Sequence, residues 1–310
     1  MNISPTLGVW LLSDDYDGHG DAKTISASAF SQPVKALLLS RRVTDKTPVS
    51  VDSLVASKVG TAIHEAIERS WLDPEKVYAA LEKLELPARR YIVNPQGKVP
   101  EGMIPVYLEQ RVSRKHKGWT VTGKYDMVFD GRVHDYKSTK AFVIQKQLNN
   151  KKWRLQGSIY RWLNPEVITD ESLLVEAIVL DWNSGAASSD PAYPQSAWTP
   201  VSIPLLSLEQ TEDYISNKLE LLDDLSDAPE ADMPRCTDEE LWRDEPTFAY
   251  YASGVVAGRS TKNFKSRVEA DAHLVSKGKG VIQERPGPAR ACSYCPAAPI
   301  CQQRLEYLND

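Results

Sequence analysis

The sequence predicts an α/β fold, in which strands from the middle of the chain lie among amphipathic helices. Strand-like segments with alternating apolar and polar side chains fall between residues 103 and 182. Apolar residues at helical spacing fall on either side of them, over about 26–90 and over 205–225. The 310 residues, 42% hydrophobic and 25% charged, provide enough apolar surface for the core of an ordinary globular protein.

Three helical segments are expected before residue 90. The first runs from Ser26 to Arg42, and the second from Val51 to about Trp71. The third runs from Glu75 to Leu86 and follows a proline, which suits a first helical turn. Residues 1–24 are polar and are expected to form an irregular arm.

Three strands are expected next, over Ile104 to Val112, Trp119 to Phe129 and Arg132 to Ser138. Asp130-Gly131 is a strong hairpin signal between the last two, so we expect an antiparallel meander. The remaining expected elements are a helix over 144–163, a strand over 173–182, a loop over 183–200 and a helix over 205–225.

A domain boundary is predicted near residue 230, because residues 227–234 are acidic and contain two prolines. Residues 1–230 are expected to form the core, and 231–310 a four-cysteine metal-binding subdomain packed back on it. Thr237-x-x-Glu240 is a capping-box pattern that predicts a helix start.

Composition excludes some classes of protein. No apolar run is long enough to cross a bilayer, and the first residues lack a signal-peptide pattern, so we expect a cytoplasmic protein without a membrane partner. The net charge of −5 gives no global signature of nucleic-acid binding, although an enzyme needs only a local basic groove.

Two carboxylates and an ammonium group form the first candidate site. Alternation on a strand places Asp135 and Lys137 on one face, and the Asp130-Gly131 hairpin brings Asp126 near Asp135. The two carboxylates repel unless a cation lies between them or one binds a proton, and oxygen ligands favour Mg²⁺ or Mn²⁺ over zinc. Lys137 would position a water or stabilise phosphorane charge. Alternatively, the lysine merely pairs with a carboxylate on a solvated strand face.

Other residues extend this candidate site. His64, on a helix four residues after Gly60, is either a further metal ligand or a surface histidine. Glu109 either reaches the same cation or forms a surface ion pair.

A helix after the lysine strand carries Gln156 and Tyr160, four residues apart and therefore on one face. Both side chains can hydrogen-bond a phosphate or the catalytic strand. Trp153 and Tyr160 either stack on bases or belong to the core.

The four cysteines form a second candidate site, at Cys236, Cys292, Cys295 and Cys301. In a reducing compartment such a group points to a metal rather than to disulfides. Both a tetrahedral zinc and a [4Fe–4S] cluster take four cysteines. Between Cys236 and the triplet lies a basic run, from Arg259 to Lys279, which either follows a DNA backbone or is a solvated face.

The ordered set of motifs resembles the RecB-type branch of the PD-(D/E)XK nuclease superfamily. The motifs are Gly60-x-x-x-His64, Gly123-x-x-Asp126, Asp135-Tyr136-Lys137 and Gln156-x-x-x-Tyr160. The resemblance covers about residues 26–165 and implies a central mixed sheet flanked by helices, with Mg²⁺- or Mn²⁺-dependent DNA cleavage. Tyr125 stands where the superfamily name has proline, which this branch commonly lacks.

The resemblance also assigns roles. The metal ligands would be His64, Glu109, Asp126, Asp135 and the main-chain carbonyl of Tyr136. Lys137 would be the catalytic lysine, and Gln156 and Tyr160 the accessory motif.

The cysteine tail resembles that of iron–sulfur members of the branch, including CRISPR-adaptation nucleases. This resemblance favours [4Fe–4S] over structural Zn²⁺. Those relatives usually place the fourth cysteine before the nuclease motifs, whereas Cys236 follows them.

The resemblance finally implies an exonuclease that acts on single-stranded or duplex DNA ends in recombination or repair. The chain resembles phage-encoded enzymes, which would act in a bacterial cytoplasm or an infected cell, with a recombination or replication protein as a partner. The alternatives are a non-catalytic DNA-binding or assembly protein with the same fold, and a redox-sensing iron–sulfur DNA-binding protein.

Overall fold

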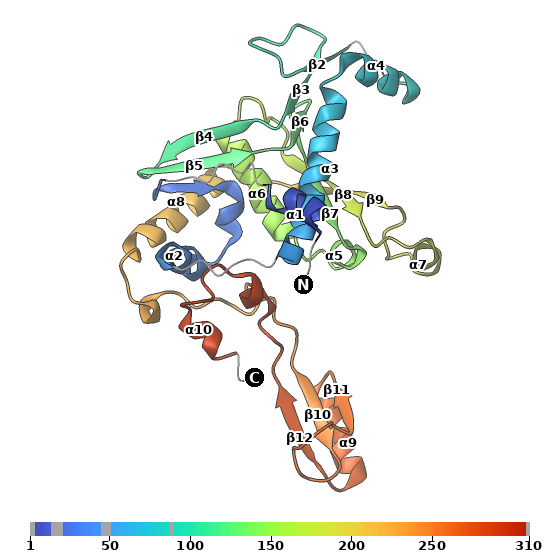
Figure 1. The fold of residues 1–310 in the computed structure, drawn as a ribbon, viewed down its shortest axis with the longest axis vertical. Helices are drawn as coiled ribbons and strands as arrows, with labels where there is room; N and C mark the ends of the chain where they lie inside the picture. The colour runs from blue at the N-terminus through green and yellow to red at the C-terminus, as the bar shows by residue number, and fades with distance from the viewer. Residues whose placement is uncertain (1–3, 14–20, 45–50, 87–89, 308–310) are drawn as a thin grey trace. The chain divides into compact units, whose positions relative to one another are not determined.

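A six-stranded mixed sheet organises the larger part of the computed structural model (Figure 1), in the order β2-β3-β6-β7-β8-β9. The strands are β2 (Tyr91–Val93), β3 (Ile104–Leu108), β6 (Met127–Phe129), β7 (Arg132–Thr139), β8 (Ser172–Val179) and β9 (Trp198–Pro204). The pairs β2·β3 and β7·β8 are parallel and the others antiparallel. The expected central mixed sheet is therefore confirmed.

The structure describes residues 4–13, 21–44, 51–86 and 90–307. They divide into two compact units, the first within 1–31 and 48–220 and the second within 32–47 and 221–310.

A smaller sheet interrupts the expected meander. After Leu108 the chain leaves the central sheet, forms β4 (Arg111–His116) and β5 (Trp119–Lys124), and returns as β6. Together with β1 (Thr24–Ser26), these two strands form a sheet in the order β1-β5-β4. The predicted single strands over 104–112 and 119–129 are therefore wrong, because each is divided between the two sheets. The first one breaks at Glu109, whose φ of 48° is in the left-handed region that ends regular strand pairing.

Helices α3 (Val55–Trp71) and α6 (Asn150–Leu163) pack against strands of the central sheet. The other helices described up to residue 224 are α1 (Pro5–Leu12), α2 (Val34–Arg42), α4 (Pro74–Lys83), α5 (Ala141–Gln145), α7 (Ser184–Ser189) and α8 (Leu208–Asp224). The expected irregular arm is wrong over Pro5–Leu12, which is helical, while Asp14–Gly20 lies outside the described residues. None of the described helices has the length and apolar character needed to cross a membrane.

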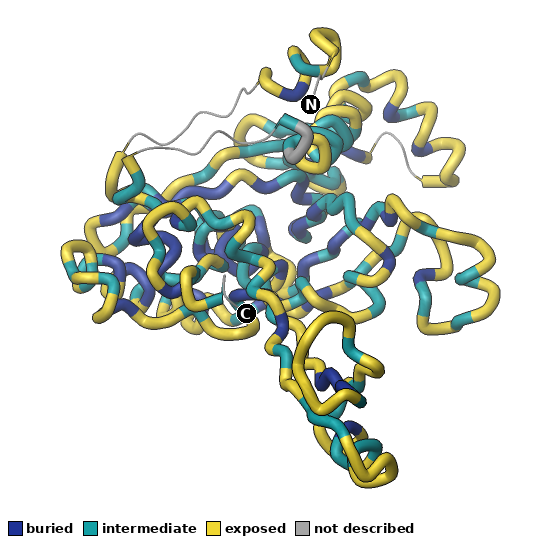
Figure 2. The backbone as a smooth tube through the Cα atoms, turned by 60° about the horizontal axis from the view of Figure 1, so that its bottom comes forward, coloured by how far each residue is buried: buried dark blue, intermediate teal, exposed yellow. Residues whose placement is uncertain are grey.

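Close backbone approaches hold α3 and α6 against the sheet. A Cβ on Gly60 of α3 would lie 3.3 Å from the Ser138 hydroxyl of β7. A Cβ on Gly157 of α6 would lie 3.1 Å from the Leu173 side chain of β8. Buried residues are coloured dark blue in Figure 2. The central strands supply much of the core, and six of their side chains are at most 1% exposed: Val106, Val128, Val133, Leu173, Val175 and Ala177.

The second unit contains a separate three-stranded antiparallel sheet in the order β11-β10-β12. Its elements are β10 (Thr247–Tyr251), β11 (Lys262–Phe264), α9 (Arg267–Lys277) and β12 (Val281–Arg285), followed by α10 (Gln302–Leu305). The capping box forms, with Thr237 N donating to Glu240 Oε2 at 2.8 Å and Glu240 N donating to Thr237 Oγ1 at 3.3 Å. A turn follows it instead of the expected helix, so that prediction is wrong.

Candidate metal centre

The candidate site lies where the chain changes sheets. Glu109 follows β3 and Asp126 precedes β6, and the Glu109 amide donates to the Asp126 carbonyl at 2.9 Å. One backbone hydrogen bond thus joins the two breaks, and both carboxylates belong to the same bend.

His64 of α3 lies between this bend and β7. Its Nε2 donates to the carbonyl of Tyr136 at 2.8 Å, and its Nδ1 lies 3.3 Å from Asp126 Oδ1. The other Asp126 oxygen accepts from the Tyr136 amide at 2.9 Å. One ligand atom from each of His64, Glu109 and Asp126 lies within 4.8 Å of the other two, and no other such trio of His, Cys, Asp or Glu occurs in the described residues. A nitrogen and two carboxylate oxygens at this spacing fit a divalent cation.

Asp135 and Lys137 lie on the same face of β7, as strand alternation predicts. Lys137 Nζ is 2.6 Å from Asp135 Oδ2. Asp135 is 2% exposed, and neither of its carboxylate oxygens has a hydrogen bond in the described part of the chain. Lys137 forms an ion pair with Oδ2, whereas Oδ1 has no partner in the described residues. Buried carboxylate oxygens ordinarily have a partner, so Oδ1 fits a cation ligand.

The pKa values of the two aspartates are shifted in opposite directions. Burial and the nearby charge of Asp126 raise the pKa of Asp135 above its ordinary value, although Lys137 opposes the rise. Burial acts in the same direction on Asp126, but the hydrogen bond from His64 and the charge of Lys137 outweigh it and lower its pKa. Burial lowers the pKa of Lys137, yet the two aspartates outweigh it and hold that pKa above its ordinary value. The lysine is therefore a cation, and its positive charge offsets part of the negative charge of the two aspartates.

Lys124 is a member of the site that sequence reasoning missed. Its Nζ lies 2.5 Å from Glu109 Oε2, and the Glu109 side chain is 14% exposed. Burial and the charge of Asp126 raise the pKa of Glu109, despite the hydrogen bond from Lys124. Lys124 stands inside the Gly123-x-x-Asp126 motif, but nothing in the sequence pairs it with Glu109, because that contact depends on the bend.

Gln156 and Tyr160 meet on α6, where Gln156 Nε2 donates to the Tyr160 hydroxyl at 2.7 Å. Burial and the charges of Asp135 and Asp126 raise the pKa of Tyr160 well above its ordinary value, so it stays neutral. Trp153 and Tyr160 are only 5% and 4% exposed, which makes both core aromatics rather than stacking platforms for bases. A Cβ on Gly123 would lie 2.9 Å from the Tyr160 ring, so the glycine permits this packing.

A cavity of about 690 Å³ opens beside these residues. Its lining includes His64, Glu109, Lys124 and Tyr160, together with Trp10 of α1 and Lys58 of α3. Sequence reasoning missed Trp10 and Lys58. Trp10 was missed because α1 was not expected to be a helix, and Lys58 because nothing but its residue type distinguishes it on α3.

The cysteines are free thiols, each partly buried, in the second unit. In the described residues no three of their sulfur atoms lie within 4.8 Å of one another, so a cysteine-ligated subdomain is not confirmed. Burial, Glu240 and the neighbouring Cys301 and Cys295 raise the pKa of Cys236 to about 12. Cys295 and Cys301 thus influence the pKa of Cys236, but the sulfur atoms do not lie close enough together in the described residues to form a metal site.

Solved structures with similar chains show low identity. The protein titled "Crystal structure of SSO0001" is 12% identical, with 70% of this chain and 85% of that chain covered and a TM-score of 0.43. A phage-related exonuclease from Haemophilus somnus 129PT is 11% identical, with 66% of this chain and 96% of that chain covered and a TM-score of 0.29.

A search of curated proteins finds no match. The family model described as the PD-(D/E)XK nuclease superfamily matches residues 36–302. That span contains His64, both aspartates, Lys137 and the accessory pair of α6. The chain belongs to the PD-(D/E)XK nuclease superfamily.

Proposed function

We propose that the protein is a metal-dependent deoxyribonuclease that hydrolyses phosphodiester bonds. The observation that carries the proposal is the buried Asp135, which has no hydrogen bond in the described residues. It lies next in the chain to Tyr136, whose backbone contacts both His64 and Asp126. A buried carboxylate beside a second carboxylate is stabilised most simply by a cation.

The ligands of that cation would be His64, Glu109, Asp126, Asp135 and the carbonyl of Tyr136. Mg²⁺ or Mn²⁺ suits these mainly oxygen ligands, and when bound it lowers the pKa of a water and neutralises charge on a phosphate oxygen. Metal binding by this set requires His64 Nδ1 to be free of its proton, Glu109 to turn from Lys124, and the Tyr136 carbonyl to be released from His64 Nε2, because each of these groups already has a partner.

Lys137 would orient the attacking water and stabilise the negative charge that develops on the phosphate. Gln156 and Tyr160 would hold a non-bridging phosphate oxygen, since the neutral Tyr160 hydroxyl accepts from Gln156 and keeps its own proton to donate. Lys124, once released from Glu109, would add a further positive charge to the same cavity.

The finer proposal is an exonuclease that acts on DNA ends in recombination or repair, supported by the RecB-type order of the motifs. The rival is a non-catalytic DNA-binding protein with this fold. That rival is disfavoured because no member of the expected set of ligands and lysine has been replaced.

The test compares 5′- and 3′-labelled linear DNA, both single- and double-stranded, with circular DNA, in Mg²⁺, Mn²⁺ or EDTA. Asp135→Ala and Lys137→Ala should lower the rate by about a hundredfold to a thousandfold. The exposed Asp227→Ala and Lys115→Ala serve as controls and should keep it. Cleavage in EDTA, or equal cleavage by the Asp135 and Lys137 variants, contradicts the mechanism. Cleavage of circular DNA contradicts an exonuclease.

For the tail we propose that Cys236, Cys292, Cys295 and Cys301 bind a [4Fe–4S] cluster, with structural Zn²⁺ as the alternative. The spacing Cys292-x2-Cys295-x5-Cys301 supports a shared site, and the charges of Cys301 and Cys295 add to the rise in the pKa of Cys236. Anaerobic protein should absorb visible light if it holds the cluster and be colourless with zinc, which metal analysis can then quantify. Protein that contains neither metal contradicts both.

A further inference from the structure

The sheet β11-β10-β12 and helix α9 form a small module within residues 246–288, between Cys236 and Cys292. We call it the basic module. It has a core of its own, because the buried side chains of β10 pack with α9, where Ala270 is 0% exposed. The buried residues of β10 are Phe248, Ala249, Tyr250 and Tyr251.

The basic module has a charge opposite to that of the chain. It contains seven Lys and Arg residues and three Asp and Glu residues, a net charge of +4, while the whole chain carries −5. One of its three acidic side chains, Asp271, is engaged by Arg267 at 3.0 Å. Apart from this pair, six basic side chains face only two acidic ones in the basic module.

Three lysines gather at one end of the basic module. The His273 ring packs against Tyr250 and Phe264, with ring centroids 4.9 Å and 5.0 Å apart. Lys262 pairs with Tyr250 in the register of β10 and β11, and its Nζ lies 4.9 Å from the centroid of the Phe264 ring. Lys277 is in the last turn of α9, the helix that carries His273, and burial and the charges of Lys262 and Lys277 lower the pKa of His273.

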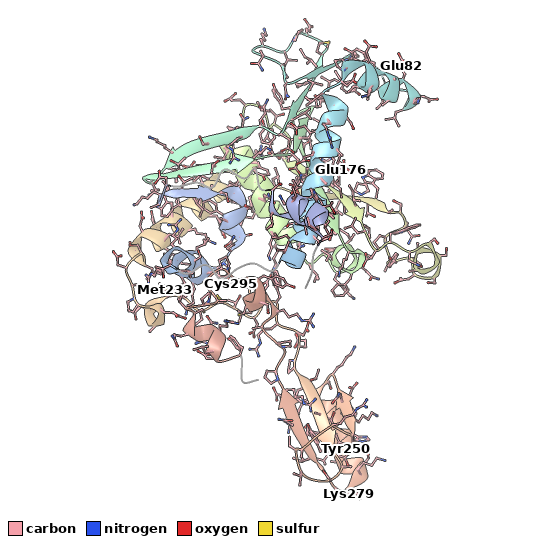
Figure 3. All side chains as sticks on the ribbon, viewed as in Figure 1. Glu82, Glu176, Met233, Tyr250, Lys279 and Cys295 are labelled. Atoms are coloured by element: carbon pink, nitrogen blue, oxygen red, sulfur yellow. The ribbon has the colours of Figure 1, made fainter. Side chains whose placement is uncertain are left out.

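The third lysine, Lys279, is fixed to the same aromatic group. Its carbonyl accepts a hydrogen bond from the Tyr250 hydroxyl at 2.8 Å, and Figure 3 shows Tyr250 and Lys279 at the same end of the basic module. Lys262, Lys277 and Lys279 are all exposed, and no ion pair with any described residue neutralises them. We call these three residues the lysine cluster.

A solvated face explains this arrangement only in part. Lys277 is favoured in the last turn of α9 by the helix dipole, but this reason does not apply to Lys262 or Lys279. Three like charges on one small end repel one another, and a polyanion would relieve that repulsion.

We propose that the lysine cluster binds the phosphate backbone of DNA, independently of sequence and of the catalytic cation. The proposal rests on the proposed function for the identity of the polyanion. Lysine is suited to phosphate as a point charge. The tyrosines of β10 are buried and unavailable for stacking, which favours backbone contact over base readout.

The test is DNA binding in EDTA, measured by fluorescence anisotropy at salt concentrations from about 50 to 300 mM. The variant Lys262→Gln/Lys277→Gln/Lys279→Gln is compared with a control that loses the same charge elsewhere, Lys76→Gln/Lys83→Gln/Lys98→Gln. For duplex DNA, losing three phosphate contacts makes the plot of log affinity against log salt shallower by about 2 to 3. At the lowest salt the affinity should fall at least tenfold, while the control keeps the wild-type slope.

An unchanged slope and affinity in the cluster variant overturns the proposal, and so does equal competition by polyaspartate and by DNA. If the cluster variant cleaves DNA and keeps the wild-type slope, the proposed DNA binding by the lysine cluster is wrong, while the proposed nuclease activity stands. If the wild-type protein binds DNA through the cluster but never cleaves it with Mg²⁺ or Mn²⁺, the proposed nuclease activity is wrong, while DNA binding by the cluster stands.

Discussion

Replacing Lys137 by methionine separates the counter-charge that its ammonium group supplies from the catalytic role proposed for it. Methionine keeps much of the apolar stem and removes the charge that lies 2.6 Å from Asp135 Oδ2. The carboxylate is then left 2% exposed beside Asp126, without a cation. We expect it to bind a proton, because burial already raises its pKa.

The size of the effect follows from the cost of that proton. Protonating a carboxyl group of ordinary pKa 3.8 costs about 4 kcal/mol at pH 7 and about 2 kcal/mol at pH 5. These values are ceilings, because the raised pKa of Asp135 makes its protonation easier. The folded variant holds a proton that the unfolded chain releases, so its free energy of unfolding falls relative to the wild type as pH rises from about 4 to 7.

The assay is urea unfolding of Lys137→Met and wild type at pH 5 and pH 7.5, with and without Mn²⁺. We expect a loss of about 2 to 4 kcal/mol at the higher pH, a smaller loss at pH 5, and a larger Mn²⁺ rescue than in wild type. The rescued variant should still be inactive, and the exposed control Lys115→Met should change stability by less than about 0.5 kcal/mol. A loss that is equal at both pH values, or a rescue no larger than that of wild type, would refute this reasoning.

Three further predictions concern binding and packing. Asp126→Asn should abolish stabilisation by Mn²⁺, which in wild type is about 3 kcal/mol at a hundred times Kd, and a thermal shift that survives the change contradicts its role as a ligand. Gly123→Ala should cost about 1 to 3 kcal/mol in chemical denaturation, because the new methyl group would lie 2.9 Å from Tyr160; unchanged stability contradicts that packing. Glu230→Gln should cost about 1 to 2 kcal/mol at pH 7, since Glu230 accepts from the first two amides of α10 at 2.9 and 3.1 Å. Those hydrogen bonds outweigh burial and lower its pKa, so its contribution is present above the ordinary value of 4.5 and is lost as pH falls below it; a cost independent of pH contradicts this.

Local signals predicted several elements correctly. Asp130-Gly131 forms the expected hairpin, with φ values of 48° and 81°, because both residues tolerate the left-handed region that such a turn requires. Alternation along β7 correctly placed Asp135 and Lys137 on one face, which depends only on the period of a strand.

Other signals failed where a contact distant in sequence decided the outcome. The alternating pattern continued through Glu109, yet the chain bends there because β4 and β5 pair in another sheet. The capping box at Thr237 forms its hydrogen bonds, but the segment after it remains a turn. Caps select where a helix starts, whereas its continuation depends on packing.

The sequence by itself determined the mixed α/β class, the helices α2, α3, α4, α6 and α8, the hairpin and the set of carboxylates and lysine, because these depend on residue type and short-range periodicity. Only the tertiary structure showed that His64, Glu109 and Asp126 converge, that Lys124 pairs with Glu109, and that Asp135 is buried without a hydrogen bond in the described residues. These features depend on a bend between two sheets and on a helix that approaches β7 at Gly60. Such contacts join residues far apart in the chain, and no local pattern specifies their geometry.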